Sequence, residues 1–362
     1  MARMAREEQF SPDEIAVVHV MNRVVRCCAL MGDDPLTGKN FDHRKQWVEH
    51  ELNRVAPQFG IDLLAFAVLS NHFHLVLRSR PDVVGTWDDR EVARRWMTLC
   101  PKRKNKDGSA QLPNEREINA LCSNKKKLAD IRSRLSDISW WMRLVCQRIA
   151  QKANAEEEEV GKFWQSRYKA VRLLDEEAIL ACTAYVDLNP IRAAIAETVE
   201  TSDFTSVQLR IKALRNSLTY DNQASVLATD SLAVSLPPLA DAILAPLEID
   251  ELNDPIGARP AKNGRRASDK GFLAMPLAAY LELLDWTARQ IVTGKRGATP
   301  EQAPALLERL NIGPEVWCEL VSQFGRLFSL VAGKPRCVDD HRGRLSKRRF
   351  FLHPSTRELL GT

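Results

Sequence analysis

The 362-residue sequence has no C-x-x-C pair among its eight cysteines, few tyrosines, and no apolar run approaching the ~18 residues of a membrane span. The scattered cysteines exclude a zinc ribbon and provide no disulfide framework, which indicates a reducing compartment. Residues 1–10 ("MARMAREEQF") lack the apolar core of a signal peptide. We therefore expect a cytoplasmic protein with no membrane association.

The charge of the chain is mildly basic, with 52 Lys and Arg against 47 Asp and Glu. The cations gather in three runs, "PKRKNKD" (101–107), "NKKKLADIRSR" (124–134) and "RGRLSKRR" (342–349). For any single run, a solvated surface is the simpler interpretation. Three runs, with Trp140 and Trp141 close to one of them, favour an anionic polymer because phosphates attract cations and bases stack on aromatic rings. The candidate nucleic-acid contacts are Lys102, Arg103, Lys104, Lys125, Lys126 and Lys127.

Apolar periodicity predicts a regular order of strands and helices in the first half of the chain. The predicted strands are 15–30, 61–70, 73–80 and 161–174, and the predicted helices are 41–60, 136–159 and 175–189. A hairpin is expected at Ser70 and Asn71, Ser136 or Asp137 is expected to cap the second helix, and three acids at 175–177 should open the third. The order β-α-β-β-α-β-α predicts an α+β domain with a ferredoxin-like antiparallel sheet.

Three regions are expected along the chain. Residues 1–215 form the α+β domain, with a basic insertion at about 81–129 that is long for a loop. Residues 216–270 are rich in Pro, Asp and Ser and read as a linker or loosely packed region. Residues 271–362 show helical periodicity and predict a mainly helical C-terminal extension with a basic tail.

Two histidines, His72 and His74, lie one residue apart at the start of the predicted strand in "LSNHFHLVLRSRP". Residues i and i+2 of a strand point to the same face, so both imidazoles project together while Phe73 points away. Two neutral imidazoles can hold one metal ion and leave positions open for substrate. An isolated pair of this kind is also consistent with two half-buried histidines that make local hydrogen bonds.

A second motif, "AYVDLNPIRA" (184–193), places Tyr185 and Asn189 one helical turn apart. A phenol can attack phosphorus, and a carboxamide oxygen can bind a divalent cation. Two structural alternatives stay open. Tyr185 could be a core residue, and Asn189, which precedes Pro190, could be the N-cap of a new helix.

The segments "VLSNHFHLVL", "FWQSRY" and "AYVDLNPIRA", in this order, resemble the REP-associated tyrosine transposases, which are single-tyrosine members of the HUH-endonuclease superfamily. The resemblance covers about residues 17–207. It implies an HUH-type catalytic domain within 1–215, in which His72 and His74 bind Mg²⁺ or Mn²⁺ and Tyr185 is the nucleophile. Asn189 matches the position of a third polar ligand.

The resemblance further implies a transposase that cuts and rejoins single-stranded DNA through a 5′-phosphotyrosine. The DNA partner is expected to carry a hairpin or inverted repeat, the protein to be a monomer or homodimer, and its location to be the nucleoid. Arg167 and Arg192 are candidates for phosphate contact, with a surface ion pair as the equal alternative. Two other functions stay open: a domesticated DNA-binding protein that no longer cuts, and a relaxase or replication-initiator nickase. The position of the tyrosine after the histidines disfavours the nickase.

Overall fold

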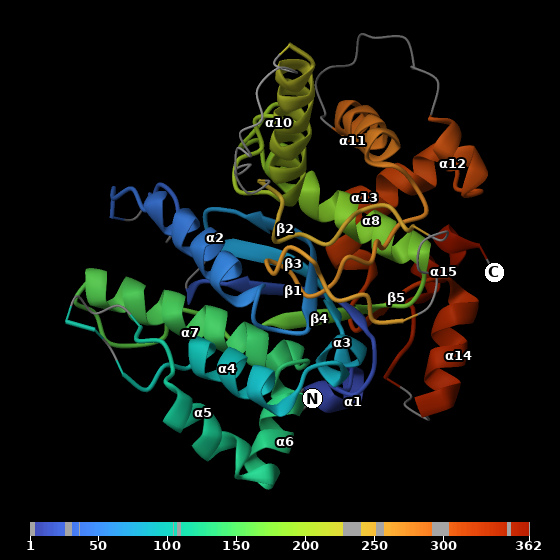
Figure 1. The fold of residues 1–362 in the computed structure, drawn as a ribbon. Helices are drawn as coiled ribbons and strands as arrows, with labels where there is room; N and C mark the ends of the chain where they lie inside the picture. Colours follow the sequence, from blue (N-terminus) through green and yellow to red (C-terminus); the bar gives the residue numbers. More distant parts are fainter. Residues whose placement is uncertain are drawn as a thin grey trace.

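A five-stranded sheet forms the centre of the protein (Figure 1). The computed structural model describes residues 4–25, 31–35, 37–103, 105–106, 110–226 (without the side chains of 218–226), 240–250, 257–291, 304–345 and 349–361. The strands are β1 (Val17–Arg23), β2 (Ile61–Val68), β3 (His72–Ser79), β4 (Lys169–Leu173) and β5 (Val331–Ala332). Their order is β2-β3-β1-β4-β5. All neighbours among β1 to β4 pair antiparallel, and β5 is parallel to β4.

Two long helices connect the antiparallel strands. Helix α2 (His43–Val55) lies between β1 and β2 in the chain, and α7 (Ile138–Glu156) lies between β3 and β4. The Asp137 carboxylate accepts a hydrogen bond from the Ser139 amide and so caps α7, which resolves the alternative between Ser136 and Asp137. The predicted hairpin is present, with the Leu69 amide bonded to the His72 carbonyl at 2.9 Å. The predicted α+β class is therefore confirmed.

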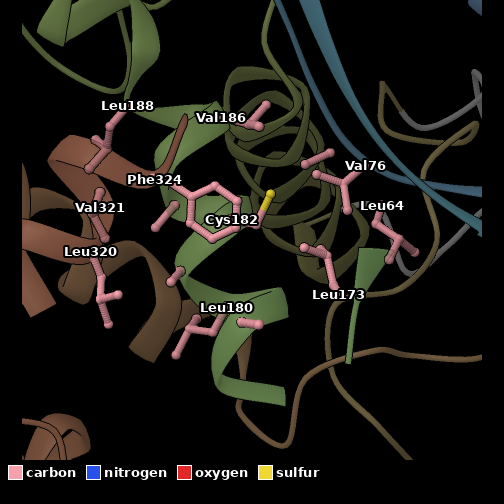
Figure 2. Packing of buried hydrophobic residues seen from close by; sticks show 14 of the residues in the cluster. Leu64, Val76, Leu173, Leu180, Cys182, Val186, Leu188, Leu320, Val321 and Phe324 are labelled. Carbon is pink, nitrogen blue, oxygen red and sulfur yellow. The ribbon is translucent and has the colours of Figure 1, made fainter. Parts of the chain in front are cut away.

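Each face of the sheet carries its own hydrophobic cluster. Val18, Val20 and Phe73 point to the face that α2 and α7 cover. Val76 points to the other face, where α8 (Glu176–Asp187) and α13 (Pro314–Leu327) pack (Figures 1 and 2). Helix α8 begins as predicted, because Asp175 accepts from the Ala178 amide and two acids follow in the first turn. The sheet thus separates two layers of helices.

The basic insertion, which is long for a loop, is built mainly of helices in its described part. It contains α3 (Pro81–Gly85), α4 (Asp89–Leu99), α5 (Glu115–Cys122) and α6 (Lys125–Arg134). Asp88, Asn114 and Asn124 cap the last three helices with side-chain hydrogen bonds. The apolar residues of these helices join the cluster on the α7 side of the sheet, namely Val92, Ala93, Met97, Ile118, Leu121, Leu128 and Ile131. Burial of this apolar surface stabilises the helices. In the sequence, the charged residues between the apolar positions hide the helical spacing.

The C-terminal extension is mainly helical, and it also supplies β5. The remaining helices are α1 (Arg6–Gln9), α9 (Asn189–Arg192), α10 (Ser206–Val226), α11 (Leu277–Ile291), α12 (Ala305–Arg309), α14 (Pro335–Leu345) and α15 (Pro354–Leu360). Phe324 of α13 and Cys182 of α8 belong to one hydrophobic cluster (Figure 2). The boundaries proposed at 215 and 270 stay a prediction. In the part of the chain that the structure describes, no helix is long and apolar enough to span a bilayer.

A buried ion-pair network attaches residues 257–271 to the sheet. Asp62 of β2 is fully buried and accepts hydrogen bonds from Arg78, Arg80 and Ser268. Arg78 also donates to the carbonyls of Lys270 and Gly271, at 2.7 and 2.8 Å. Because an isolated buried carboxylate is costly, these donors hold the segment in one place on the sheet.

Candidate active site

The two histidines of β3 lie together on the face of the sheet that α8 and α13 cover. In the register of β1 and β3, His74 is opposite Met21 and His72 is opposite Arg23. The His72 and His74 ring centroids are 4.9 Å apart, and the rings are nearly perpendicular. The Nδ1 atom of His72 bonds to the carboxamide oxygen of Asn71 at 2.5 Å. The geometry that the i, i+2 spacing predicts for this pair is therefore present.

A third histidine, His19 of β1, contacts His74. The His19 Nε2 and His74 Nδ1 atoms are 2.8 Å apart, and the two rings stack with their centroids 5.1 Å apart. Both side chains are buried, and His74 Nε2 is a buried nitrogen with no hydrogen-bond partner. When His74 Nδ1 donates to His19, His74 Nε2 presents a lone pair toward the site. Sequence reasoning missed His19, whose only signal was a polar residue within an apolar strand.

All three imidazoles are neutral at neutral pH. Burial, and to a lesser degree the charge on His72, lowers the pKa of His19 to about 4. Burial and the nearby Arg23 lower the pKa of His72 to about 4 as well. The pKa of His74 lies well below its usual value, chiefly because the ring is buried. Neutral imidazoles keep the lone pairs that a metal ligand requires.

Tyr185 of α8 lies against these histidines. Its ring meets His74 edge-on with centroids 5.4 Å apart, and His19 edge-on at 5.9 Å. The tyrosine is half-buried. The Arg192 guanidinium lies over its ring at 4.7 Å, and Phe324 of α13 packs beside it at 5.7 Å. The structure therefore brings Tyr185, His74 and His72 together from two elements that are far apart in the sequence.

Helix α13 approaches the phenol oxygen through a glycine. A Cβ atom placed on Gly325 would lie 3.1 Å from the Tyr185 hydroxyl oxygen, closer than ordinary van der Waals contact. Gly325 itself is exposed. At this position α13 therefore places no side chain against the hydroxyl.

Asn189 is the first residue of α9 and is buried. Leu188 occupies the N-cap position, and no side chain caps this helix, so the alternative that Asn189 is an N-cap is wrong. Its Nδ2 atom is buried without a hydrogen-bond partner. This unpaired atom is a hydrogen-bond donor, whereas a carboxamide binds a cation through its oxygen. Its assignment as a metal ligand stays a prediction.

The candidate donors for a divalent cation are three protein groups at most. Two neutral imidazoles, one with an unpaired buried nitrogen, are present, and the Asn189 carboxamide is the third candidate. Across the described ranges, no group of three or more His, Cys, Asp or Glu side chains is placed to hold a metal. Imidazole ligands suit Mn²⁺ better than Mg²⁺, which prefers oxygen.

The other tyrosines are elsewhere or engaged. Tyr168 belongs to the cluster on the α7 side of the sheet, where its hydroxyl lies 3.1 Å from Ser139 Oγ and burial raises its pKa. Tyr280 is fully buried and donates to Asp187 at 2.7 Å. The side chain of Tyr220 lies outside the described residues. Tyr185 is thus the tyrosine that the structure places beside the histidines.

The basic residues predicted from the insertion are not part of this site. Helices α4 to α6 lie on the α7 side of the sheet, away from the histidine face (Figure 1). Lys125 is exposed but pairs with Asp89 at 2.8 Å, and Arg103 pairs with Glu117 at 2.9 Å. Three further candidates are exposed lysines, Lys102, Lys126 and Lys127. Lys104 lies outside the described residues.

The two predicted arginines differ in position. Arg167 is exposed and donates to the Met4 carbonyl at 2.9 Å. Arg192 stacks on Tyr185 and donates to the Ser322 carbonyl of α13. Arg192 therefore belongs to the site. Among the described residues it does not form the surface ion pair that was the alternative for it.

Comparison with known proteins shows a distant structural similarity. No family model matches the chain, and no curated protein matches it. A solved structure of a REP-associated tyrosine transposase bound to a REP hairpin is similar over 66% of this chain and 94% of that chain. The sequence identity is 12% and the TM-score is 0.33. The functional interpretation of this chain therefore depends on its own residues.

Proposed function

We propose that this protein is an HUH-type tyrosine transposase that cleaves and rejoins single-stranded DNA with a divalent cation. The observation that carries the proposal is the edge-on contact between the Tyr185 phenol and the neutral, buried His74. A nucleophile beside two potential metal ligands suits metal-assisted phosphoryl transfer to a tyrosine. The unit β1-α2-β2-β3-α7-β4 is the ferredoxin-like catalytic domain in this proposal.

The residues have separate tasks in this mechanism. His72 and His74 would hold the cation, with Asn189 as the third ligand, and His19 would orient His74 through the Nε2–Nδ1 hydrogen bond. The cation, when bound, supplies Lewis acidity toward a non-bridging phosphate oxygen. The Arg192 guanidinium lies over the Tyr185 ring and offers a positive charge for a phosphate oxygen.

The reaction exchanges one phosphodiester for another. The Tyr185 oxygen forms a bond to phosphorus, and the bond from phosphorus to the 3′ oxygen breaks. The phenol loses one proton and the departing 3′ oxygen gains one. The product is a 5′-phosphotyrosine that stores the energy of the broken bond, so a 3′ hydroxyl can reverse the step without ATP. Single-stranded DNA with a hairpin, as in REP or inverted-repeat elements, is the substrate class we propose.

The test is formation of a covalent adduct. Wild-type protein is incubated with Mn²⁺ and labelled single-stranded hairpin oligonucleotides, and adducts are detected on a denaturing gel. Tyr185→Phe should abolish the adduct, because no other tyrosine of known position lies beside the histidines. Tyr168→Phe is the matched control and should retain the adduct, since Tyr168 lies on the other face of the sheet. An adduct that survives Tyr185→Phe would contradict the assignment of the nucleophile.

A DNA-binding protein that no longer cuts is the second candidate. It is favoured by the limited donor set, which contains no described carboxylate beside the two histidines. This candidate predicts that hairpin binding is unaffected by EDTA and that the wild type forms no adduct in Mn²⁺ or Mg²⁺.

A further inference from the structure

A cleft of about 800 Å³ is lined by Arg192, the arginine that lies over the Tyr185 ring, and the proposed chemistry does not account for it. Its volume is within the ~300–1,000 Å³ typical of ligand-binding pockets. Arg192 of α9 lines one side, and α13 and the start of α15 supply most of the rest. The polar lining residues that matter here are Arg192, Ser322, Gln323, Arg326, His353 and Ser355.

The cleft and the tyrosine share one segment of α13. Gly325, which faces the Tyr185 hydroxyl, directly precedes Arg326, which lines the cleft. Arg192 connects the two sites from the other side, because the same guanidinium lies over the tyrosine ring and lines the cleft. The cleft and the tyrosine are therefore joined by the Arg192 side chain and by one turn of α13.

The lining is suited to a phosphodiester backbone. It contains two guanidinium groups against one carboxylate, that of Glu319, so its formal charge is positive. Arg326 is exposed, and its Nη1 atom lies 3.4 Å from Gln323 Oε1, which is at the limit of a hydrogen bond. Hydroxyl and amide groups of Ser322, Gln323 and Ser355 add neutral donors. Guanidinium groups bind phosphate oxygens in a bidentate geometry that neutral donors can supplement.

We propose that this cleft binds the DNA strand that stays joined to Tyr185 after cleavage. The inference rests on the proposed function. In phosphoryl transfer the attacking and departing oxygens are roughly in line, so the departing 3′ strand leaves on the side of the phosphorus away from the tyrosine. The retained 5′ strand has no such constraint and can lie beside the tyrosine, where the cleft is. Holding this strand keeps the phosphotyrosine available for rejoining, and it gives the C-terminal extension a role in DNA binding.

The first experiment measures binding without cleavage. The full-length Tyr185→Phe protein is titrated with fluorescein-labelled single-stranded oligothymidine and followed by anisotropy. Adding Arg326→Gln should weaken binding about tenfold, the effect of losing one charge-assisted hydrogen bond. Arg336→Gln is the matched control, because Arg336 is an exposed arginine of α14 that does not line the cleft. Equal oligothymidine affinities for Arg326→Gln and its parent would overturn the proposal. An equal loss of affinity in Arg326→Gln and Arg336→Gln would also overturn it.

The second experiment uses the covalent reaction. Once the scissile phosphate has been mapped with wild-type protein, the strand downstream of it is shortened to one nucleotide. Shortening should slow adduct formation about tenfold in wild type and leave the rate of Arg326→Gln almost unchanged. An equal effect of shortening in both proteins would overturn the proposal.

The two proposals can fail separately. If no adduct forms but oligothymidine binding still depends on Arg326, the proposed catalysis fails and the cleft is a DNA-binding site. If the adduct forms and binding is indifferent to Arg326, the cleft assignment fails alone.

Discussion

Replacing Gly325 by alanine should slow the proposed cleavage while leaving the protein at least as stable. The added Cβ would lie 3.1 Å from the Tyr185 hydroxyl oxygen and 3.8 Å from Cζ. The 3.1 Å contact is tighter than most Cβ atoms make, so the phenol or the helix must shift by a few tenths of an ångström. A misplacement of ~1 Å at a reacting group can cost about 100-fold in rate, so we expect a loss of about tenfold.

The stability of this variant should change in the opposite direction. Alanine is favoured over glycine in a helix interior by ~1 kcal/mol, and Gly325 is the third residue from the end of α13, where the gain is smaller. Gly343 is a matched control, because it is the third residue from the end of α14 and a Cβ there would meet nothing within 4 Å.

The assay compares the two glycine variants. Adduct formation is followed in a single turnover at saturating DNA, and unfolding is followed in urea. Gly325→Ala should lose rate and Gly343→Ala should not, while both keep or gain stability. A wild-type rate in Gly325→Ala would refute the placement of the reacting oxygen beside α13. Equal losses in both variants would show that the effect is not local to Tyr185.

Three further predictions concern the metal, the lysines and pH. His72→Ala or His74→Ala should weaken Mn²⁺ binding in calorimetry at least tenfold and leave hairpin affinity nearly unchanged, since phosphate contacts supply most of that affinity; undiminished Mn²⁺ binding would exclude the pair as ligands. Changing Lys126 and Lys127 to Gln should weaken binding of matched and scrambled hairpins alike and flatten the salt slope by about 0.7 per lost contact, whereas an altered hairpin preference would assign these lysines to sequence reading. Burial, and then the charge of Arg172, lowers the pKa of His341 from 6.5 to about 4. Between these pH values the His341 imidazole is protonated in the unfolded chain and neutral in the folded protein. Stability should therefore fall as pH drops from 6.5 toward 4, and His341→Gln should remove up to about 1.4 kcal/mol per pH unit of that slope in urea titrations; identical slopes would contradict the shift.

Local patterns in the sequence were sufficient for the elements around the histidines. Alternating apolar residues predicted β3 and the face that His72 and His74 share, and Asp175 with two acids predicted the start of α8. These features depend on residues close together in the chain. The same reasoning failed for the insertion, because charged residues between the buried positions of α4 to α6 conceal their helical spacing.

Contacts between distant segments were beyond this reasoning. His19 contacts His74 only because of the register between β1 and β3, in which His19 is opposite Val76 and the two histidines are diagonal neighbours. The packing of α13 on Tyr185 and the addition of β5 to the sheet likewise join segments more than a hundred residues apart. Nothing in the local sequence around Tyr185 indicates that a glycine at 325 faces its hydroxyl.

The most direct test of the account is to identify the residue that carries the DNA. Wild-type protein is incubated with single-stranded hairpin DNA and Mn²⁺, the DNA is trimmed with nuclease, and the tryptic peptides are sequenced by mass spectrometry. The account predicts a nucleotide 5′-phosphate on Tyr185, formed only with the cation and lost in EDTA. A nucleotide on any other residue, or an adduct that forms at the same rate in EDTA, would contradict it.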